Sequence, residues 1–71
     1  MEKEQIHKDI LGITYQETIK YFDKFSKSNI KYYFRPIRID NKDLWFDNKK
    51  DELRCNVIVK KNLIYRIDGW Y

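Results

Sequence analysis

Three large apolar side chains stand in a row inside a stretch of this chain that is otherwise charged and polar. They are Leu44, Trp45 and Phe46, and Asp47 follows them directly. Their chemistry would be that of binding, because an exposed aromatic side chain can anchor another protein. The same residues can instead fold inward and cap a small core, since a buried tryptophan covers a large area. The sequence leaves both interpretations open.

No group of residues predicts catalysis. A nucleophile, a base and an orienting acid do not converge in the pattern, and neither a phosphate-binding loop nor metal-ligand spacing occurs. The lone histidine, His7, is interpreted as a solvated surface residue. Cys55 lies on the apolar side of a predicted strand, where we expect a small buried hydrophobe rather than a reactive thiol. We therefore expect neither enzyme activity nor a cofactor nor a bound metal.

Basic and aromatic residues on the first predicted strand suggest another kind of binding. Proteins that bind single-stranded nucleic acids combine cationic side chains with rings on which bases stack. The strip would consist of Lys31, Tyr33, Arg35 and Arg38. It would need a sheet face free of acids, and the simpler interpretation is a solvated face that carries a few tyrosines.

Length, charge and cysteine content limit the domain number and the cellular location that the sequence allows. The 71 residues predict a single domain, residues 1–71. The net charge of +4 comes from 15 basic and 11 acidic residues that are interleaved, which is typical of a solvated surface. A single cysteine leaves no internal disulfide and favours a reducing compartment. Without a signal-peptide pattern or an apolar stretch of membrane-spanning length, we expect the cytoplasm, or a host cell's cytoplasm, rather than secretion or a membrane.

The first helical segment is short. Ile6 and Ile10 lie four residues apart within residues 3–11, as they would on the apolar side of one or two helical turns. Gly12 suits the position after a helix end, where a left-handed backbone suits glycine. The pattern therefore predicts a helical turn or two that ends before Gly12.

The main helix is predicted over residues 15–26. Thr14 and Glu17 have the spacing of a capping box, in which each side chain accepts from the other residue's backbone N–H. Ser28 and Asn29 are predicted to end the helix. Its buried face is expected to contain Tyr15, Ile19, Phe22 and either Phe25 or Ser26.

Residues 30–39 alternate between apolar and polar side chains and predict a strand. The apolar positions of its first half are Ile30, Tyr32 and Phe34. Pro36 has no N–H to donate, so the strand must bulge, lie at an edge or end there. The alternation changes phase at this proline, because Ile37 and Ile39 are the next apolar positions.

The second half of the chain predicts a loop and a hairpin. Residues 40–52 lack periodicity and are interpreted as a long loop, a length that is often functional. Strands are predicted at 53–59 and 63–67, joined by a turn in which Asn62 takes a positive φ. The residues predicted to share the apolar side are Leu53, Cys55, Val57 and Val59 in one strand, and Leu63, Tyr65 and Ile67 in the other. The expected fold is α+β: one main helix packed on a small mixed three-stranded sheet, with a long loop between the first and second strands.

Several short motifs follow one another along residues 10–69. A glycine, one residue and a threonine precede the main helix, a strand runs into a proline before the long loop, and an Arg-x-Asn-Val-x-Val-like pattern follows the loop. The residues concerned are Gly12, Ile13, Thr14 and Glu17; Phe34, Arg35 and Pro36; residues 54–59; and Ile64, Ile67 and Gly69. This order resembles the potato inhibitor I family of small serine-protease inhibitors.

The resemblance implies a binding function for the long loop. In that family the loop carries a large apolar residue followed by Asp or Glu, and the bond between the two is offered to the protease. Phe46 and Asp47 would be this pair, within a loop at residues 43–50. The implied partner is a chymotrypsin- or subtilisin-like serine protease, and the function is that of its inhibitor.

The resemblance also implies that charged side chains from the sheet support the loop. Arg54 is the expected support, and Lys49 and Lys50 are candidate helpers. The family usually has a second basic residue two positions after the supporting arginine, where this chain has Asn56.

An interaction module that blocks a partner other than a protease is the alternative. Its anchors would be the aromatic residues of the loop together with those near the end of the sequence. They are Trp45, Phe46, Trp70 and Tyr71. This alternative and the inhibitor share the loop as the contact surface and differ in the partner.

Overall fold

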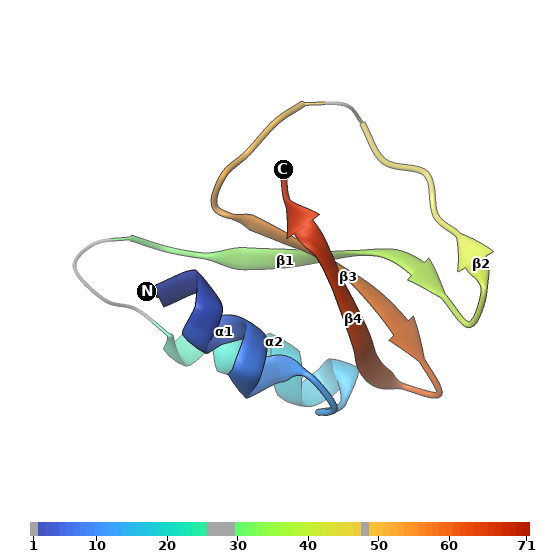
Figure 1. Cartoon of the computed structure of the whole chain (residues 1–71), viewed down its shortest axis with the longest axis horizontal. Coiled ribbons are helices and arrows are strands. Elements are labelled where there is room, and N and C mark those ends of the chain that lie inside the picture. Colours follow the sequence, from blue (N-terminus) through green and yellow to red (C-terminus); the bar gives the residue numbers. More distant parts are fainter. Residues whose placement is uncertain (1, 26–29, 48) are drawn as a thin grey trace.

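The computed structural model describes residues 2–25, 30–47 and 49–71. Within these residues the elements are α1 (Glu2–Ile10), α2 (Tyr15–Lys24), β1 (Tyr33–Ile39), β2 (Lys42–Asp43), β3 (Arg54–Lys60) and β4 (Leu63–Trp70). The strand order is β2-β1-β3-β4, in which β1 and β3 are parallel and the two outer pairs are antiparallel. Both helices lie on one side of the sheet, and the segment between β2 and β3 arches away on the other side (Figure 1). The α+β class is confirmed, while α1 as a full helix and β2 as a fourth strand go beyond the predicted elements.

The connection between the helices forms as the sequence predicts. Ile6 and Ile10 of α1 are fully buried, and Gly12 has a φ of +87° just beyond the helix. The capping box is present: Glu17 N–H donates to Thr14 Oγ1 at 3.0 Å, and Thr14 N–H donates to Glu17 Oε1 at 2.9 Å. These two hydrogen bonds satisfy backbone donors that the first turn of α2 would otherwise leave unpaired.

The buried face of α2 differs from the predicted one. Ile19 is 44% exposed, whereas Thr18 is fully buried and its hydroxyl donates to Thr14 O at 2.8 Å. Thr18 and Phe22 lie four residues apart and face the core, so Ile19 is rotated by about 100° toward solvent. The helix ends at Lys24. The residues predicted to lie at its end, Ser26, Ser28 and Asn29, lie outside the described residues.

Of the three outcomes predicted at Pro36, namely a bulge, a sheet edge or the end of the strand, β1 shows the bulge. The strand begins three residues later than predicted, and Ile30 is 37% exposed. The pairing register with β3 shifts directly after Pro36, which leaves Ile37 as the extra residue. Because of this bulge, Phe34 and Ile39 both pack against the core although they are five residues apart.

The first part of the predicted loop is a hairpin. Asp40 and Asn41 have positive φ values of 50° and 69°, and the two residues of β2 then pair with the end of β1. Two consecutive positive φ values suit a tight hairpin turn, and Asn and Asp tolerate them better than most residues. A two-residue strand is too short to produce a period, so the sequence pattern did not reveal it.

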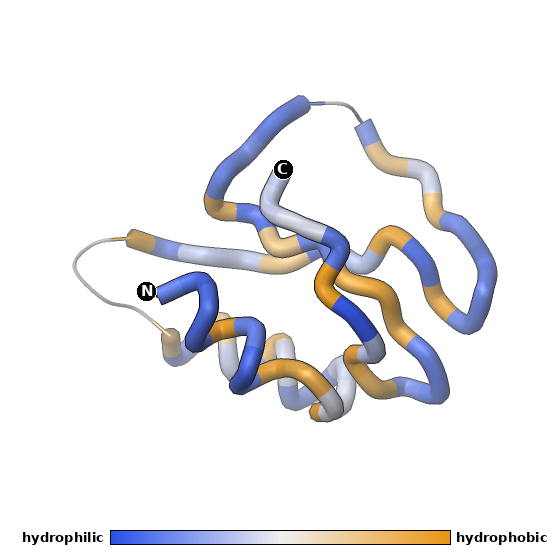
Figure 2. The backbone as a smooth tube through the Cα atoms, viewed as in Figure 1, coloured by the Kyte–Doolittle hydropathy of each residue, from blue (hydrophilic) through white to orange (hydrophobic). Residues whose placement is uncertain are grey.

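The core lies between β3 and the helices. Cys55, Val57 and Val59 are buried, as predicted, whereas Leu53 precedes the strand and is 38% exposed. The residues between them, Asn56 and Ile58, are also buried, because β3 is covered on both faces. Figure 2 shows apolar residues along β3 and along α1, and hydrophilic ones in the segment that leads into β3.

The predicted apolar side of β4 is wrong. Leu63 and Tyr65 are 41% and 58% exposed, and Ile64 is buried instead. The register shifts between Ile58, which pairs with Arg66, and Val59, which pairs with Ile64, so Tyr65 is an extra residue. After this bulge, Ile67 packs against the core as predicted. The strand continues to Trp70, three residues beyond the predicted end, and the turn with Asn62 at a φ of 66° is confirmed.

Candidate protein-contact loop

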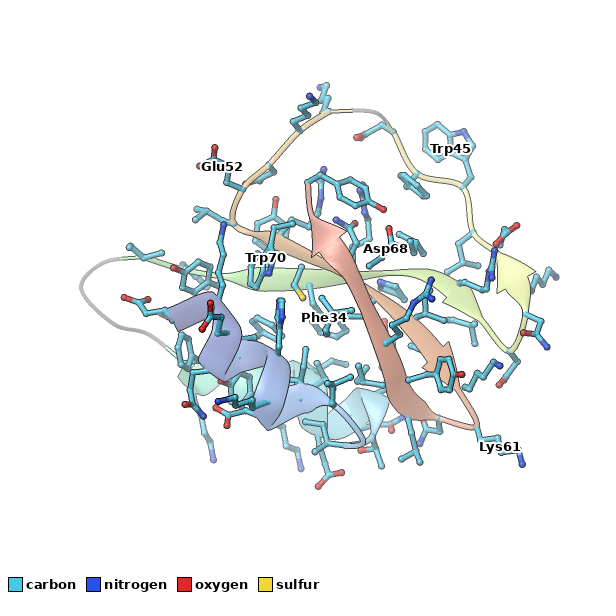
Figure 3. All side chains as sticks on the ribbon, in the orientation of Figure 1. Phe34, Trp45, Glu52, Lys61, Asp68 and Trp70 are labelled. Atoms are coloured by element: carbon cyan, nitrogen blue, oxygen red, sulfur yellow. The ribbon has the colours of Figure 1, made fainter. Side chains whose placement is uncertain are left out.

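The segment between β2 and β3 forms an arch, here residues 44–47 and 49–53. It starts with a hydrogen bond from Leu44 N–H to Ile37 O at 3.0 Å. Leu44 and Phe46 then line a hollow of about 140 Å³ whose floor includes Ile58 of β3. Trp45 lies between them and is 89% exposed, and its ring points away from the sheet (Figure 3). The two interpretations of the apolar triplet thus apply to different residues: Leu44 and Phe46 cover the sheet, and Trp45 is presented to solvent.

Phe46 is partly buried against two other side chains. The Arg35 Cζ atom lies 4.5 Å from the centre of the Phe46 ring, a cation–π distance. The ring of Tyr71, the residue after β4, also lies near Phe46, with 6.3 Å between the centres of the two rings. Phe46 is therefore fastened to the sheet and is not a free anchor.

Arg35 is itself held by Asn56, its partner in the register between β1 and β3. Arg35 Nε donates to Asn56 Oδ1 at 2.8 Å, and Asn56 Nδ2 donates to Gly69 O of β4 at 3.2 Å. Arg35 Nη1 also lies 3.9 Å from Asp47 Oδ1, but the Asp47 side chain is half exposed, and such a pair is worth about 0–1 kcal/mol. Because Asn56 is fully buried, its hydrogen bonds determine the position of the guanidinium.

Arg54 contacts the other end of the arch. Its Nη2 donates to Lys49 O at 2.5 Å and to the main-chain oxygen of Tyr71 at 2.8 Å. Its Nε is buried and has no partner among the described residues. Lys49 and Lys50 are exposed, and Lys49 takes part through its carbonyl rather than its ammonium group. Arg35 and Arg54, from neighbouring strands, therefore hold the arch at two points.

The return of the arch to β3 is organised by Asp51. The Tyr33 hydroxyl donates to the Asp51 carboxylate, and Leu53 N–H donates to Asp51 Oδ1 at 2.9 Å. These hydrogen bonds, that of Tyr33 first, hold the pKa of Asp51 below its ordinary value. The same contact raises the pKa of Tyr33, because ionised tyrosine would lose the bond and face a negative charge.

The residues of the alternative nucleic-acid strip lie close to acids. Arg38 Nε donates to Asp43 Oδ1 at 2.7 Å, Arg35 faces Asp47, and Tyr33 donates to Asp51. Lys31, the fourth member, is exposed. The acid-free face that such a strip would need is not present among the described residues.

The aromatic residues at the end of the sequence are not exposed anchors. Trp70 packs against the core and meets the Tyr32 ring edge to face at 5.4 Å. Its indole Nε1 donates to His7 Nε2 at 2.8 Å, so the interpretation of His7 as a solvated residue is wrong. Tyr71 lies beneath the arch, where its ring faces Phe46. The contact between His7 and Trp70 was not predictable from the sequence pattern, because the two residues are 63 positions apart.

Cys55 is fully buried, as predicted. Burial raises the pKa of its thiol to about 12, so it stays protonated at neutral pH. Among the described residues, no group of three or more His, Cys, Asp or Glu side chains could hold a metal ion. No helix within those residues is long and apolar enough to cross a membrane.

A second concave surface lies away from the arch. It has a volume of about 840 Å³ and is bordered by the two tight turns, at Asp40–Asn41 and Lys61, and by the end of α1. Leu11, Leu63 and Tyr65 line it, and each is more than 40% exposed. This groove is an apolar surface that the sequence did not indicate, because Leu63 and Tyr65 were predicted to be core.

The sequence missed Asn56 and Arg35 as supports of the loop. A polar residue between apolar neighbours in the central strand was the available signal, since such a residue is buried only with hydrogen-bond partners. The chain matches no protein-family model, no curated protein and no solved structure.

Proposed function

We propose that this chain is a binding protein that contacts another protein through residues 43–50, and most concretely that it inhibits a serine protease of the chymotrypsin or subtilisin type. The observation that supports this proposal is the presentation of Trp45, 89% exposed, just before the two points, Phe46 and Lys49, at which guanidinium groups hold the arch. The resemblance of the motif order to the potato inhibitor I family supports the same function.

The physical reason is preorganisation. A loop that is already held in an extended form loses little conformational entropy when it binds, so more of the contact energy appears as affinity. If the protease cuts such a loop, the new amine stays beside the acyl-enzyme because both halves remain attached to the sheet. Religation then competes with hydrolysis, and the enzyme is occupied rather than turned over.

A titration of chymotrypsin and of subtilisin with the protein tests the proposal. We expect the residual activity of the protease to fall as protein is added and to level off once the molar ratio of the two is reached at which the protease is saturated. The added protein should stay largely intact. The matched control is Tyr65→Ala, which removes an exposed ring from the groove and leaves the arch unchanged. Complete digestion without a lag, with no loss of activity toward a small substrate, would contradict inhibition.

An interaction module that blocks a partner other than a protease is the second candidate. The groove favours it, because two separate exposed apolar surfaces, Trp45 and the groove, suit a protein that contacts a large partner. Capture of one partner that is lost with Trp45→Ala, together with no inhibition of either protease, would favour this candidate. Loss with Tyr65→Ala instead would assign the contact to the groove.

Binding of single-stranded nucleic acid has less support. Arg35 and Arg38 each lie against a carboxylate, which reduces the positive potential that a phosphate backbone needs. Such binding would weaken steeply as salt is added, and a fluorescently labelled oligonucleotide in a salt series measures it.

A further inference from the structure

We infer that Trp45, and not Phe46, enters the specificity pocket of the protease, so that the bond offered is the one between Trp45 and Phe46. This inference rests on the proposed inhibitory function and specifies its contact residue. Trp45 is 89% exposed, whereas its neighbours on both sides, Leu44 and Phe46, turn toward the sheet. Exposure alternates along these three residues, so Trp45 rather than Phe46 points away from the sheet and toward an approaching enzyme.

Phe46 is poorly placed to enter a pocket. It would have to leave the guanidinium of Arg35, 4.5 Å from its ring centre, and the ring of Tyr71. Those contacts also hold the arch in place, so removing Phe46 from them would loosen the loop on which inhibition depends. Trp45 can enter a pocket with none of these contacts broken.

The anchored Phe46 then has a role of its own in the reaction. The serine oxygen of the protease attacks the Trp45 carbonyl carbon, the bond to the Phe46 nitrogen breaks, and that nitrogen takes up a proton. The Trp45 acyl group is now an ester of the serine, and the Phe46 amine is the leaving group. In religation the amine loses its proton and attacks the ester, and the serine oxygen leaves and is protonated again.

Arg35 is the positioning residue for this leaving group. It contacts the Phe46 ring, faces Asp47 and is fixed by Asn56. Together these contacts keep the new amine near the ester instead of letting it diffuse away. The second basic support expected two positions after Arg54 is thus replaced by an arginine from β1 that Asn56 orients.

The inference also restricts the class of protease. A pocket that accepts Trp45 must be deep and apolar, as in enzymes that cut after large aromatic residues. A pocket with a carboxylate at its base, as in enzymes that cut after arginine, should bind the unchanged chain weakly. A change of this one side chain should therefore change which enzyme is inhibited.

The first experiment maps the cut in the unchanged chain. The protein, in a small molar excess over chymotrypsin, is incubated with the enzyme, and the masses of the fragments are measured by intact mass spectrometry. We expect residues 1–45 and 46–71 as the first pair of fragments. A first pair of 1–46 and 47–71 would overturn the inference and leave the inhibitory function standing.

The second experiment exchanges the specificity. We expect Trp45→Arg to weaken inhibition of chymotrypsin by at least roughly 30-fold, as for a central contact residue, and to gain inhibition of trypsin. Tyr65→Ala, which changes an exposed side chain away from the arch, should change neither enzyme's inhibition appreciably. Gain of trypsin inhibition with Phe46→Arg, but not with Trp45→Arg, would overturn the inference.

The two proposals fail in different ways. If neither the unchanged chain nor Trp45→Arg inhibits chymotrypsin, subtilisin or trypsin, the proposed function and the inference are both wrong. If the unchanged chain inhibits and Trp45→Ala inhibits equally well, only the assignment of Trp45 is wrong.

Discussion

Arg35 on β1 and Asn56 on β3 are direct neighbours across the parallel strand pair, and Arg35 Nε donates to Asn56 Oδ1 at 2.8 Å. This hydrogen bond joins the buried centre of the sheet to the arch, because the same guanidinium lies against Phe46. The uncharged, buried side chain of Asn56 thus determines the position of the Arg35 guanidinium against the arch.

Replacing Asn56 should destabilise the fold and free Arg35 from the hydrogen bond that positions it. Asn56→Leu leaves Arg35 Nε and Gly69 O without their partner, and we expect a loss of about 1–3 kcal/mol in unfolding free energy. Urea unfolding of Asn56→Leu, Arg35→Leu and the double variant measures the coupling. We expect non-additivity of about 0.5 kcal/mol or more, whereas additive effects would show that the two side chains act independently.

Arg54 should control how readily the arch is cut. Its Nη2 atom donates to two acceptors, Lys49 O and Tyr71 O, and the shorter side chain of lysine does not bring its ammonium group to the same position. We expect Arg54→Lys to be cleaved in the arch roughly tenfold faster by a nonspecific protease, the equivalent of one lost charge-assisted hydrogen bond. Limited proteolysis at a temperature where both proteins are folded measures this. Equal rates, with cuts outside the arch, would argue against a bracing role.

Asp51 should make the unfolding free energy depend on pH in the acidic range. Its folded pKa lies below the ordinary value of 3.8, so the folded state favours the carboxylate. The stabilisation is present above that ordinary value and is lost as the pH falls through the lowered pKa. We expect the stability difference between the unchanged chain and Asp51→Asn to shrink in urea unfolding as the pH falls below about 5. Asp23→Asn, at an exposed carboxylate of α2, is the control, and a difference that does not vary with pH would contradict the prediction.

Cys55 should be unreactive until the protein unfolds. Burial raises its pKa to about 12, and the side chain is fully buried. We expect a thiol reagent at about pH 8 to label the folded protein only as fast as it unfolds, since the thiolate is the reacting form. Labelling followed across a urea series should rise with the fraction unfolded. Labelling of the folded chain at the rate of a free cysteine would show that the face between β3 and α1 opens.

Gly12 should be needed for its backbone conformation and not for its size. A Cβ atom added there meets no atom within 4 Å, but φ is +87°. We expect Gly12→Ala to cost about 1–2 kcal/mol of unfolding free energy, and Gly12→Asn to cost less, because asparagine tolerates a left-handed backbone. Thermal unfolding of the two variants compares them, and an equal loss would indicate a steric cause instead.

Interactions between residues close in the chain were predictable. The capping box of Thr14 and Glu17, the left-handed Gly12 and the bulge after Pro36 each depend on a backbone preference or on a partner three residues away. The two faces of β4 were not predictable, because the bulge that exposes Tyr65 arises from its pairing with β3 and leaves no mark in the alternation.

The sequence by itself determined the class of the fold, the main helix with its cap, the buried side of β3 and the presence of an apolar triplet in a charged segment. Only the tertiary structure decided that Trp45 points outward while Phe46 lies against Arg35, and that His7 meets Trp70. The physical reason is the distance along the sequence over which the deciding interactions act. Helix caps and bulges follow from neighbouring residues, whereas the direction of a loop side chain depends on what strands distant in the sequence place beneath it.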